Sequence, residues 1–169
     1  TAKDTNEVKR LINLAGNYRF WKPDSSIIIA ENALSLSRQL NFVSGEAQAL
    51  ITLGEDYRIS GDFPQALDLL FKALELGRDL DNQEIEANCL DFIGIAYVDL
   101  GEPRQGLNYL LQAKELTEKL LLARQTCFGL TNIGVAYEKL NMLDSALFFH
   151  EQAYQLFTKV TPEGSRHGP

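Results

Sequence analysis

The chain has 169 residues, of which 45% are hydrophobic and 23% charged, so it can bury a core and is not disordered overall. Its net charge is −7 with acids and bases interspersed, which excludes the basic stripe that nucleic-acid binding requires. No apolar run approaches the roughly 18 residues that span a bilayer. No signal peptide precedes Thr1 either, so we expect a soluble chain without membrane contact.

The first residue is not methionine, which is typical of a processed protein or of a piece of a longer one. Cys89 and Cys127 are too few for a disulfide scaffold, and neither has a Cys or His partner in metal-ligand spacing. We therefore predict no metal site, no cofactor and no disulfide. Two free thiols fit a reducing compartment but survive in an oxidising one, so cytoplasmic and periplasmic locations both stay open.

A period of 40 residues runs along the chain. An aliphatic residue, glycine, two variable residues and tyrosine recur around Gly54, Gly94 and Gly134. Small residues follow each copy at fixed distances: Ala66, Gly106 and Ala146, then Ala73, Ala113 and Ala153. The first copy of the repeat is degenerate. Its motif ends in Tyr18, its turn is one residue shorter, and Ser26 is its small residue. The chain therefore predicts one domain of four repeats. Their approximate bounds are 7–46, 47–86, 87–126 and 127–160, and 161–169 is a predicted flexible tail.

Each repeat predicts two antiparallel helices. In the second repeat one apolar stripe contains Leu50, Leu53 and Tyr57, and another begins at Ala66 and continues with helical spacing. The segments SGDF, LGEP and NMLD separate the two stripes in successive repeats, and Gly61, Gly101 and Asn141 suit a left-handed helix end. Gly54 and Ala66 are small enough for two helices to approach closely. A single pair cannot bury both stripes, so the pairs must stack.

This pattern resembles the tetratricopeptide repeat over residues 50–74, 90–114 and 130–154. The resemblance implies an all-α fold, a right-handed superhelical α-solenoid of about four helix-turn-helix units with eight antiparallel helices. The usual unit has about 34 residues, so the longer unit here predicts second helices about two turns longer. Long repeats of this kind resemble those of bacterial signalling proteins, notably sensor histidine kinases and transcriptional regulators.

Two departures from the pattern stand out in the third repeat. Gly106 replaces alanine and Pro103 replaces an aromatic residue, which predicts looser packing there. At its end, Leu121 and Leu122 occupy positions that are polar or aromatic in the earlier repeats. We expect unusual apolar exposure at that turn.

The resemblance further implies a protein or peptide ligand in a concave groove lined by the first helix of each pair. At about 100° per residue, the predicted groove residues are Asn13, Arg19, Gln48, Thr52, Glu55, Arg58, Asn88, Asp91, Phe92, Phe128, Thr131, Asn132 and Glu138. This mixed lining suits an extended peptide, and the alternative is a merely solvated face. The clamp for chaperone C-termini is absent, because its matching positions hold Ile12, Gly16, Thr52, Asn88 and Phe92.

No catalytic set is present, so we predict that the chain is not an enzyme. His150 stands where Leu70 and Leu110 stand in earlier repeats, which indicates a packed histidine. Asp91 and Asp99 are separated by roughly 12 Å of helix, too far for a carboxylate dyad. Neighbouring Asp56 is not among the predicted groove residues.

The two ends of the array differ. At the first turn, Trp21 is predicted to cover the end of the stack. The last helix carries a predicted apolar patch of Phe148, Phe149, Leu156 and Phe157. An alternative function is therefore self-association through this helix, as a homodimer.

Overall fold

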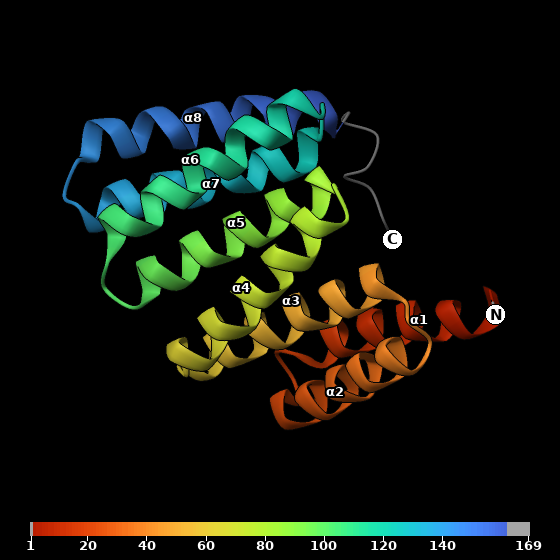
Figure 1. Ribbon diagram of the computed structural model, residues 1–169. Coiled ribbons are helices and arrows are strands. Elements are labelled where there is room, and N and C mark those ends of the chain that lie inside the picture. Colours follow the sequence, from red (N-terminus) through yellow and green to blue (C-terminus); the bar gives the residue numbers. More distant parts are fainter. Residues whose placement is uncertain (1, 162–169) are drawn as a thin grey trace, which may run out of the picture. The chain divides into compact units, whose positions relative to one another are not determined.

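The computed structural model describes residues 2–161, and in that range it contains eight α-helices and no strand. The helices are α1 (Ala2–Tyr18), α2 (Pro23–Gln39), α3 (Val43–Ser60), α4 (Phe63–Asp79), α5 (Gln83–Asp99), α6 (Pro103–Lys119), α7 (Ala123–Lys139) and α8 (Leu143–Val160), as Figure 1 shows. The predicted all-α fold of eight helices is confirmed. Of the predicted tail, residues 162–169 lie outside the described range. None of the described helices has the length and apolar character to cross a membrane.

The chain forms two compact units, one up to Phe92 and one from Ile93 on, and the division falls inside α5. In the first unit α1 packs against α2, α2 against α3, and α3 against α4. In the second unit α6 packs against α7 and α7 against α8. Figure 1 shows α7 and α8, in blue, running side by side in opposite directions. Within each unit these helices thus contact their neighbours in sequence, as stacked helical pairs require.

Left-handed residues end the helices at intervals of 20 residues. They are Asn41, Gly61, Asp81, Gly101, Leu121 and Asn141, with φ between 49° and 91°. At the end of α3 the Gly61 N–H donates to the Arg58 carbonyl and the Asp62 N–H donates to the Tyr57 carbonyl, which is the Schellman arrangement. The helix ends predicted at Gly61, Gly101 and Asn141 are confirmed.

Equal spacing of these turns makes the two helices of a repeat equally long. α3 has 18 residues and α4 has 17. The prediction that only the second helix is lengthened was therefore wrong. The extra residues of the 40-residue unit are shared between both helices, because each turn is reached after the same number of residues.

The two helices of a pair meet at glycine. A Cβ atom built on Gly54 would lie 2.6 Å from Leu70 Cγ, and one on Gly94 would lie 2.6 Å from Leu110 Cγ. At Gly134 the same atom would lie 2.4 Å from the His150 ring. The side chain on the second helix therefore occupies the space that the glycine leaves. This confirms that Gly54 is small for packing and that His150 fills the leucine position.

Packing in the third repeat is tighter than predicted. A Cβ atom on Gly106 would lie 2.5 Å from the Gly94 carbonyl oxygen and 2.7 Å from Val98 Cγ2. Because glycine is needed at both positions of this pair, the expectation of a looser repeat was wrong. Tyr97 and Tyr109 also stack here, with ring centroids 5.5 Å apart. Glycine 106 thus brings α5 and α6 closer instead of leaving a gap.

The first turn does not close the stack in the predicted way. Trp21 is 86% exposed and Phe20 is 78% exposed, so neither ring covers the core. The expectation that Trp21 forms a cap was wrong. The residue that turns inward is the preceding Arg19, whose guanidinium is described below.

We predict that Leu121→Gly stabilises the protein. Leu121 has φ 56° and is 88% exposed. Its left-handed backbone conformation is unfavourable for leucine, and its exposed side chain offsets little of that cost by packing. Relief of that conformation should raise the free energy of unfolding by about 1 kcal/mol. Thermal and urea denaturation measure the change. The matched control is Leu80→Gly, since Leu80 is a helix-terminal leucine in right-handed conformation and should lose stability. Equal effects in both variants would contradict the explanation.

Candidate binding surface

A cluster of buried charges joins α1, α2 and α3 in the first unit. Arg19 Nε donates to Asp56 Oδ1 at 2.6 Å, and Arg19 Nη2 donates to the Thr52 carbonyl at 3.3 Å. Arg58 Nε donates to Glu55 Oε1 at 2.9 Å, and Arg19 Nη1 lies 3.8 Å from Glu55 Oε2. The Ser26 hydroxyl lies 2.7 Å from Asp56 Oδ2. Two guanidinium groups therefore face two carboxylates.

This cluster withdraws two carboxylates of the first unit from solvent. The carboxylates of Glu55 and Asp56 have side-chain exposures of only 7% and 1%. Their charges are matched by cations inside the protein, and buried charges need such partners. Thr52 is also buried, and its hydroxyl donates to the Gln48 carbonyl. These contacts tie the first turn to α3.

The corresponding face of the second unit is open. Along α7, Phe128, Thr131 and Glu138 are exposed, and Asn132 and Val135 between them are half-buried. These residues follow helical spacing and lie on one side of α7. Behind them, Ile133 and Ala136 are fully buried against Val98 and Leu110 and hold α7 in place. The α7 face, defined by Phe128, Thr131, Asn132, Val135 and Glu138, is therefore a strip of aromatic, hydroxyl, amide, aliphatic and acidic groups beside a buried core.

At the start of this strip lies a partly enclosed hollow of about 320 Å³. It is lined by Arg124, Cys127, Phe128, Phe157, Val160 and Thr161. Phe128 is 57% exposed at its edge, and the Arg124 guanidinium lies 5.8 Å from the Phe128 ring centroid. The Cys127 thiol donates to the Ala153 carbonyl at 3.3 Å. An apolar side chain of a ligand fits such a lining, and one cation sits at its rim.

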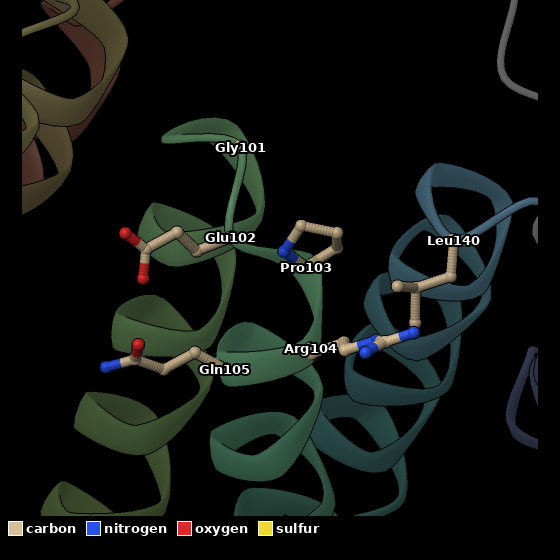
Figure 2. A pocket seen from close by; sticks show the side chains of 6 residues that line it. All are labelled: Gly101, Glu102, Pro103, Arg104, Gln105 and Leu140. Carbon is tan, nitrogen blue, oxygen red and sulfur yellow. The ribbon is translucent and has the colours of Figure 1, made fainter.

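A second hollow, of about 410 Å³, lies at the turn between α5 and α6. Figure 2 shows that its polar side chains do not converge, because Glu102 and Gln105 point away from Arg104 and Leu140. A binding site needs polar groups aimed at one ligand position. This hollow therefore carries no site.

The predicted groove residues fall into three classes of exposure. Exposed are Asn13, Gln48, Phe128, Thr131 and Glu138; half-buried are Arg19, Arg58, Asn88, Asp91, Phe92 and Asn132; buried are Thr52 and Glu55. The structure brings Arg19, Thr52, Glu55 and Arg58 together in the first unit, and it lines up Phe128, Thr131, Asn132 and Glu138 in the second.

Sequence reasoning missed three members of these sites. Asp56 was set aside because it diverges from Glu55 along the helix, yet Arg19 reaches it from 37 residues earlier. Ser26 binds the same carboxylate. Arg124 was missed because it lies one turn before the strip. Only for Arg124 was a signal present, namely a cation four residues before an exposed Phe128 on one helix.

The four residues of the predicted α8 patch differ in exposure. Phe148 is 56% and Phe157 49% exposed, but Phe149 and Leu156 are half-buried. Phe149 stacks on Tyr137 of α7 with ring centroids 5.4 Å apart. Phe149 thus belongs to the contact between α7 and α8.

A sequence profile described as "Tetratricopeptide repeat" matches residues 45–119, which cover the second and third predicted repeats. The match agrees with the glycine contacts, the helical pairs and the turns described above. Residues 45–119 are thus identified as tetratricopeptide repeats, a family of protein–protein interaction modules. A comparison with curated protein sequences finds no match.

Solved structures share this tetratricopeptide fold at low identity. The structure of BtubC (BKLC) from P. vanneervenii is 17% identical with a TM-score of 0.74, and the match covers 96% of this chain and 68% of that one. A Rap protein complexed with Competence and Sporulation Factor is 18% identical with a TM-score of 0.84, covering 91% and 43%. Aspartyl phosphate phosphatase F from Bacillus subtilis is 13% identical with a TM-score of 0.80, covering 92% and 41%. The chain thus spans less than half the length of the last two.

Burial acts on both thiols of this repeat protein. Burial raises the pKa of Cys89 to about 12, and the nearby Glu86 carboxylate acts in the same direction. Burial also raises the pKa of Cys127. Both cysteines are free. Among the described residues no group of three or more His, Cys, Asp or Glu side chains could hold a metal ion.

We predict that Arg19→Ala destabilises the first unit strongly. The change leaves the buried Asp56 carboxylate without its cation, which should lower the free energy of unfolding by about 2–4 kcal/mol. Urea denaturation followed by circular dichroism measures it. The control is Arg10→Ala, which breaks the exposed pair with Glu7 on α1. That pair should contribute less than about 1 kcal/mol. Similar losses for both variants would contradict the role of the buried cluster.

We predict unequal alkylation of the two thiols at pH 8. A raised pKa lowers the thiolate fraction, so both react slowly, and Cys89 is in addition fully buried. Iodoacetamide labelling followed by peptide mass spectrometry should modify Cys127 first. Cys89 should react only when the protein opens, and urea should equalise the two rates. Equal rates in native buffer would show that Cys89 is accessible.

Proposed function

We propose that the α7 face binds an extended peptide segment of a partner protein. The observation that carries this proposal is the exposed Phe128 at the edge of the 320 Å³ hollow, followed along α7 by Thr131, Asn132 and Glu138. Phe128 offers an apolar anchor for one ligand side chain. The hydroxyl, amide and carboxylate offer hydrogen bonds to an extended backbone.

The difference between the two units supports this assignment. Gln48 stands at the repeat position of Phe128, and in its unit Thr52 and Glu55 are buried. The Thr52 and Glu55 side chains are thus withdrawn from solvent, whereas Thr131 and Glu138 of the second unit are exposed while also contacting the Cys127 carbonyl and the His150 ring. A Rap protein of the same fold is solved with Competence and Sporulation Factor bound, which supports a binding role for such repeats.

We further propose that the repeats are the regulatory or sensory part of a larger bacterial signalling protein, such as a sensor histidine kinase or a transcriptional regulator. The long 40-residue unit supports this, and the similar Rap protein and phosphatase extend well beyond the matched region. In this arrangement a peptide binds to the α7 face, and its binding changes the activity of the attached domain. The test is to sequence the gene on both sides of this segment and to measure the activity of any attached domain with and without the bound peptide.

Peptide binding is tested with an array of 15-residue peptides, followed by calorimetric titration of each hit. Phe128→Ala should weaken binding at least tenfold, since it removes the exposed aromatic ring that would anchor an apolar side chain of the peptide. Asn132→Ala should weaken it several-fold through lost backbone hydrogen bonds. The matched control is Gln48→Ala, at the same repeat position in the first unit, which should change the affinity less than twofold. No saturable binding, or equal losses in Phe128→Ala and Gln48→Ala, would refute the proposal.

A further inference from the structure

The hollow at the start of the α7 face holds one polar donor that is left for a ligand. Three of its lining residues carry polar side chains: Arg124, Cys127 and Thr161. The Cys127 thiol donates to the Ala153 carbonyl at 3.3 Å, and the Thr161 hydroxyl donates to the Phe157 carbonyl at 2.6 Å. Both of those donors are therefore used within the protein. The exposed Arg124 guanidinium remains, beside an otherwise apolar lining.

Arg124 differs in its pairing from the arginines of the first unit. Each of those five makes an ion pair with a carboxylate of the same unit: Arg10, Arg19, Arg38, Arg58 and Arg78. Within residues 2–161 no ion pair to Arg124 occurs. Its guanidinium carbon lies 5.8 Å from the Phe128 ring centroid. A guanidinium over an aromatic face keeps its N–H groups for solvent or for an anion.

The surroundings of Arg124 are locally basic, although the chain has a net charge of −7. Glu138 is the single acid of α7, and it lies fourteen residues farther along the helix, which is about 21 Å. That separation exceeds the screening length of about 10 Å at 0.1 M salt. Residues 157–161 of α8, beside the hollow, include Lys159 and no acid. The acid at the end of α6, Glu118, pairs within its own helix.

The exposure of Phe128 and Arg124 does not depend on where the described chain ends. In the second repeat, residues 83–92 of α5 follow in the same unit. There Gln48 stands at the position of Phe128 and is exposed, and Ser44 stands at the position of Arg124 and is half-buried. Neither position is therefore buried by a helix that follows.

We propose that the peptide bound by the α7 face carries an aspartate or glutamate two residues from the apolar side chain that enters the hollow. The proposal rests on the peptide-binding function proposed above and names the class of peptide. In an extended chain, residues i and i+2 point to the same side and lie about 7 Å apart. That spacing is close to the 5.8 Å between the Arg124 guanidinium carbon and the Phe128 ring centroid. The apolar side chain thus lies against Phe128 while the carboxylate accepts from Arg124.

A side-chain carboxylate suits this hollow better than a phosphorylated residue. A phosphate group carries between one and two negative charges near pH 7 and is typically bound by clusters of arginines. The lining of the hollow holds one arginine. A single guanidinium matches the single charge of aspartate or glutamate.

The test is a second array of 15-residue peptides with blocked ends. Each has leucine at position 8 in a background of serine and threonine, and positions 6 and 10 hold glutamate, glutamine, lysine or phosphoserine. Fluorescence anisotropy measures each affinity. Glutamate at one of these positions should bind about fivefold tighter than glutamine. In the Arg124→Gln variant that difference should disappear, and in Arg124→Glu the lysine peptide should bind best. This comparison separates charge pairing from a general disturbance of Phe128.

The matched control is Arg104→Gln. Arg104 is an exposed arginine of the second unit that has no ion pair within residues 2–161, and it lines the other hollow, at the turn between α5 and α6. This variant should keep the full preference for glutamate. Circular dichroism checks that each variant is folded.

Several results would overturn the proposal. Glutamate that keeps its advantage in Arg124→Gln would pair elsewhere, and an equal loss in Arg104→Gln would show a response to net charge. Phosphoserine that binds more than tenfold tighter than glutamate would indicate a phosphopeptide site. A peptide that ends in leucine with a free carboxylate, and binds as tightly as the glutamate peptide, would indicate a C-terminal ligand. Peptides that bind without preference at positions 6 and 10 would remove the acidic ligand and leave the α7 face as a peptide site. If no peptide of either array binds, both proposals fail.

Discussion

The architecture depends on the close approach of two helices at a glycine. At Gly54, Gly94 and Gly134 a single added carbon would collide with the partner helix, so backbone meets side chain directly. Dispersion and apolar burial both increase as the helices come closer, and the side chain that enters the space is leucine twice and histidine once. This contact sets the pairing of helices in the second, third and fourth repeats. The pairing in turn decides which side of each first helix is left for ligands and which side of each second helix receives the next pair.

With the helices paired in this way, equivalent positions of two repeats can differ in role. In the first unit they form internal contacts, and in the second unit they are proposed to bind a ligand. In the first unit Arg19 inserts beside α3 and locks Glu55 and Asp56 into an internal, neutral network. In the second unit Phe128 remains at the surface. The buried network stabilises the first repeat, whose helix pair lacks the glycine contact. The open strip is what makes the second unit a candidate for binding.

Irregular features gather at the junction between α6 and α7. At the two earlier junctions an arginine reaches across to a glutamate, Arg38 to Glu46 and Arg78 to Glu86. At the third the equivalent residues are Glu118 and Thr126, and Glu118 pairs within its own helix instead. The turn there also places Leu121 in the left-handed region. The junction at which these positions hold Glu118 and Thr126 in place of an arginine–glutamate pair therefore lies directly before the strip proposed to bind a peptide.

The sequence by itself determined the repeat length, the eight helices, the glycine contacts and the turn positions. These follow from local rules, because helical spacing, small residues and left-handed turns recur at fixed intervals that neighbours in sequence can reveal. Only the tertiary structure decided that Arg19 reaches Asp56, that Trp21 stays outside, that Gly106 tightens its repeat and that Phe149 turns inward. Each of these depends on contact between residues far apart in the chain or on the distance between two packed backbones. Periodicity places a residue on a side of a helix, but the neighbouring helix decides whether that side is buried, paired or open.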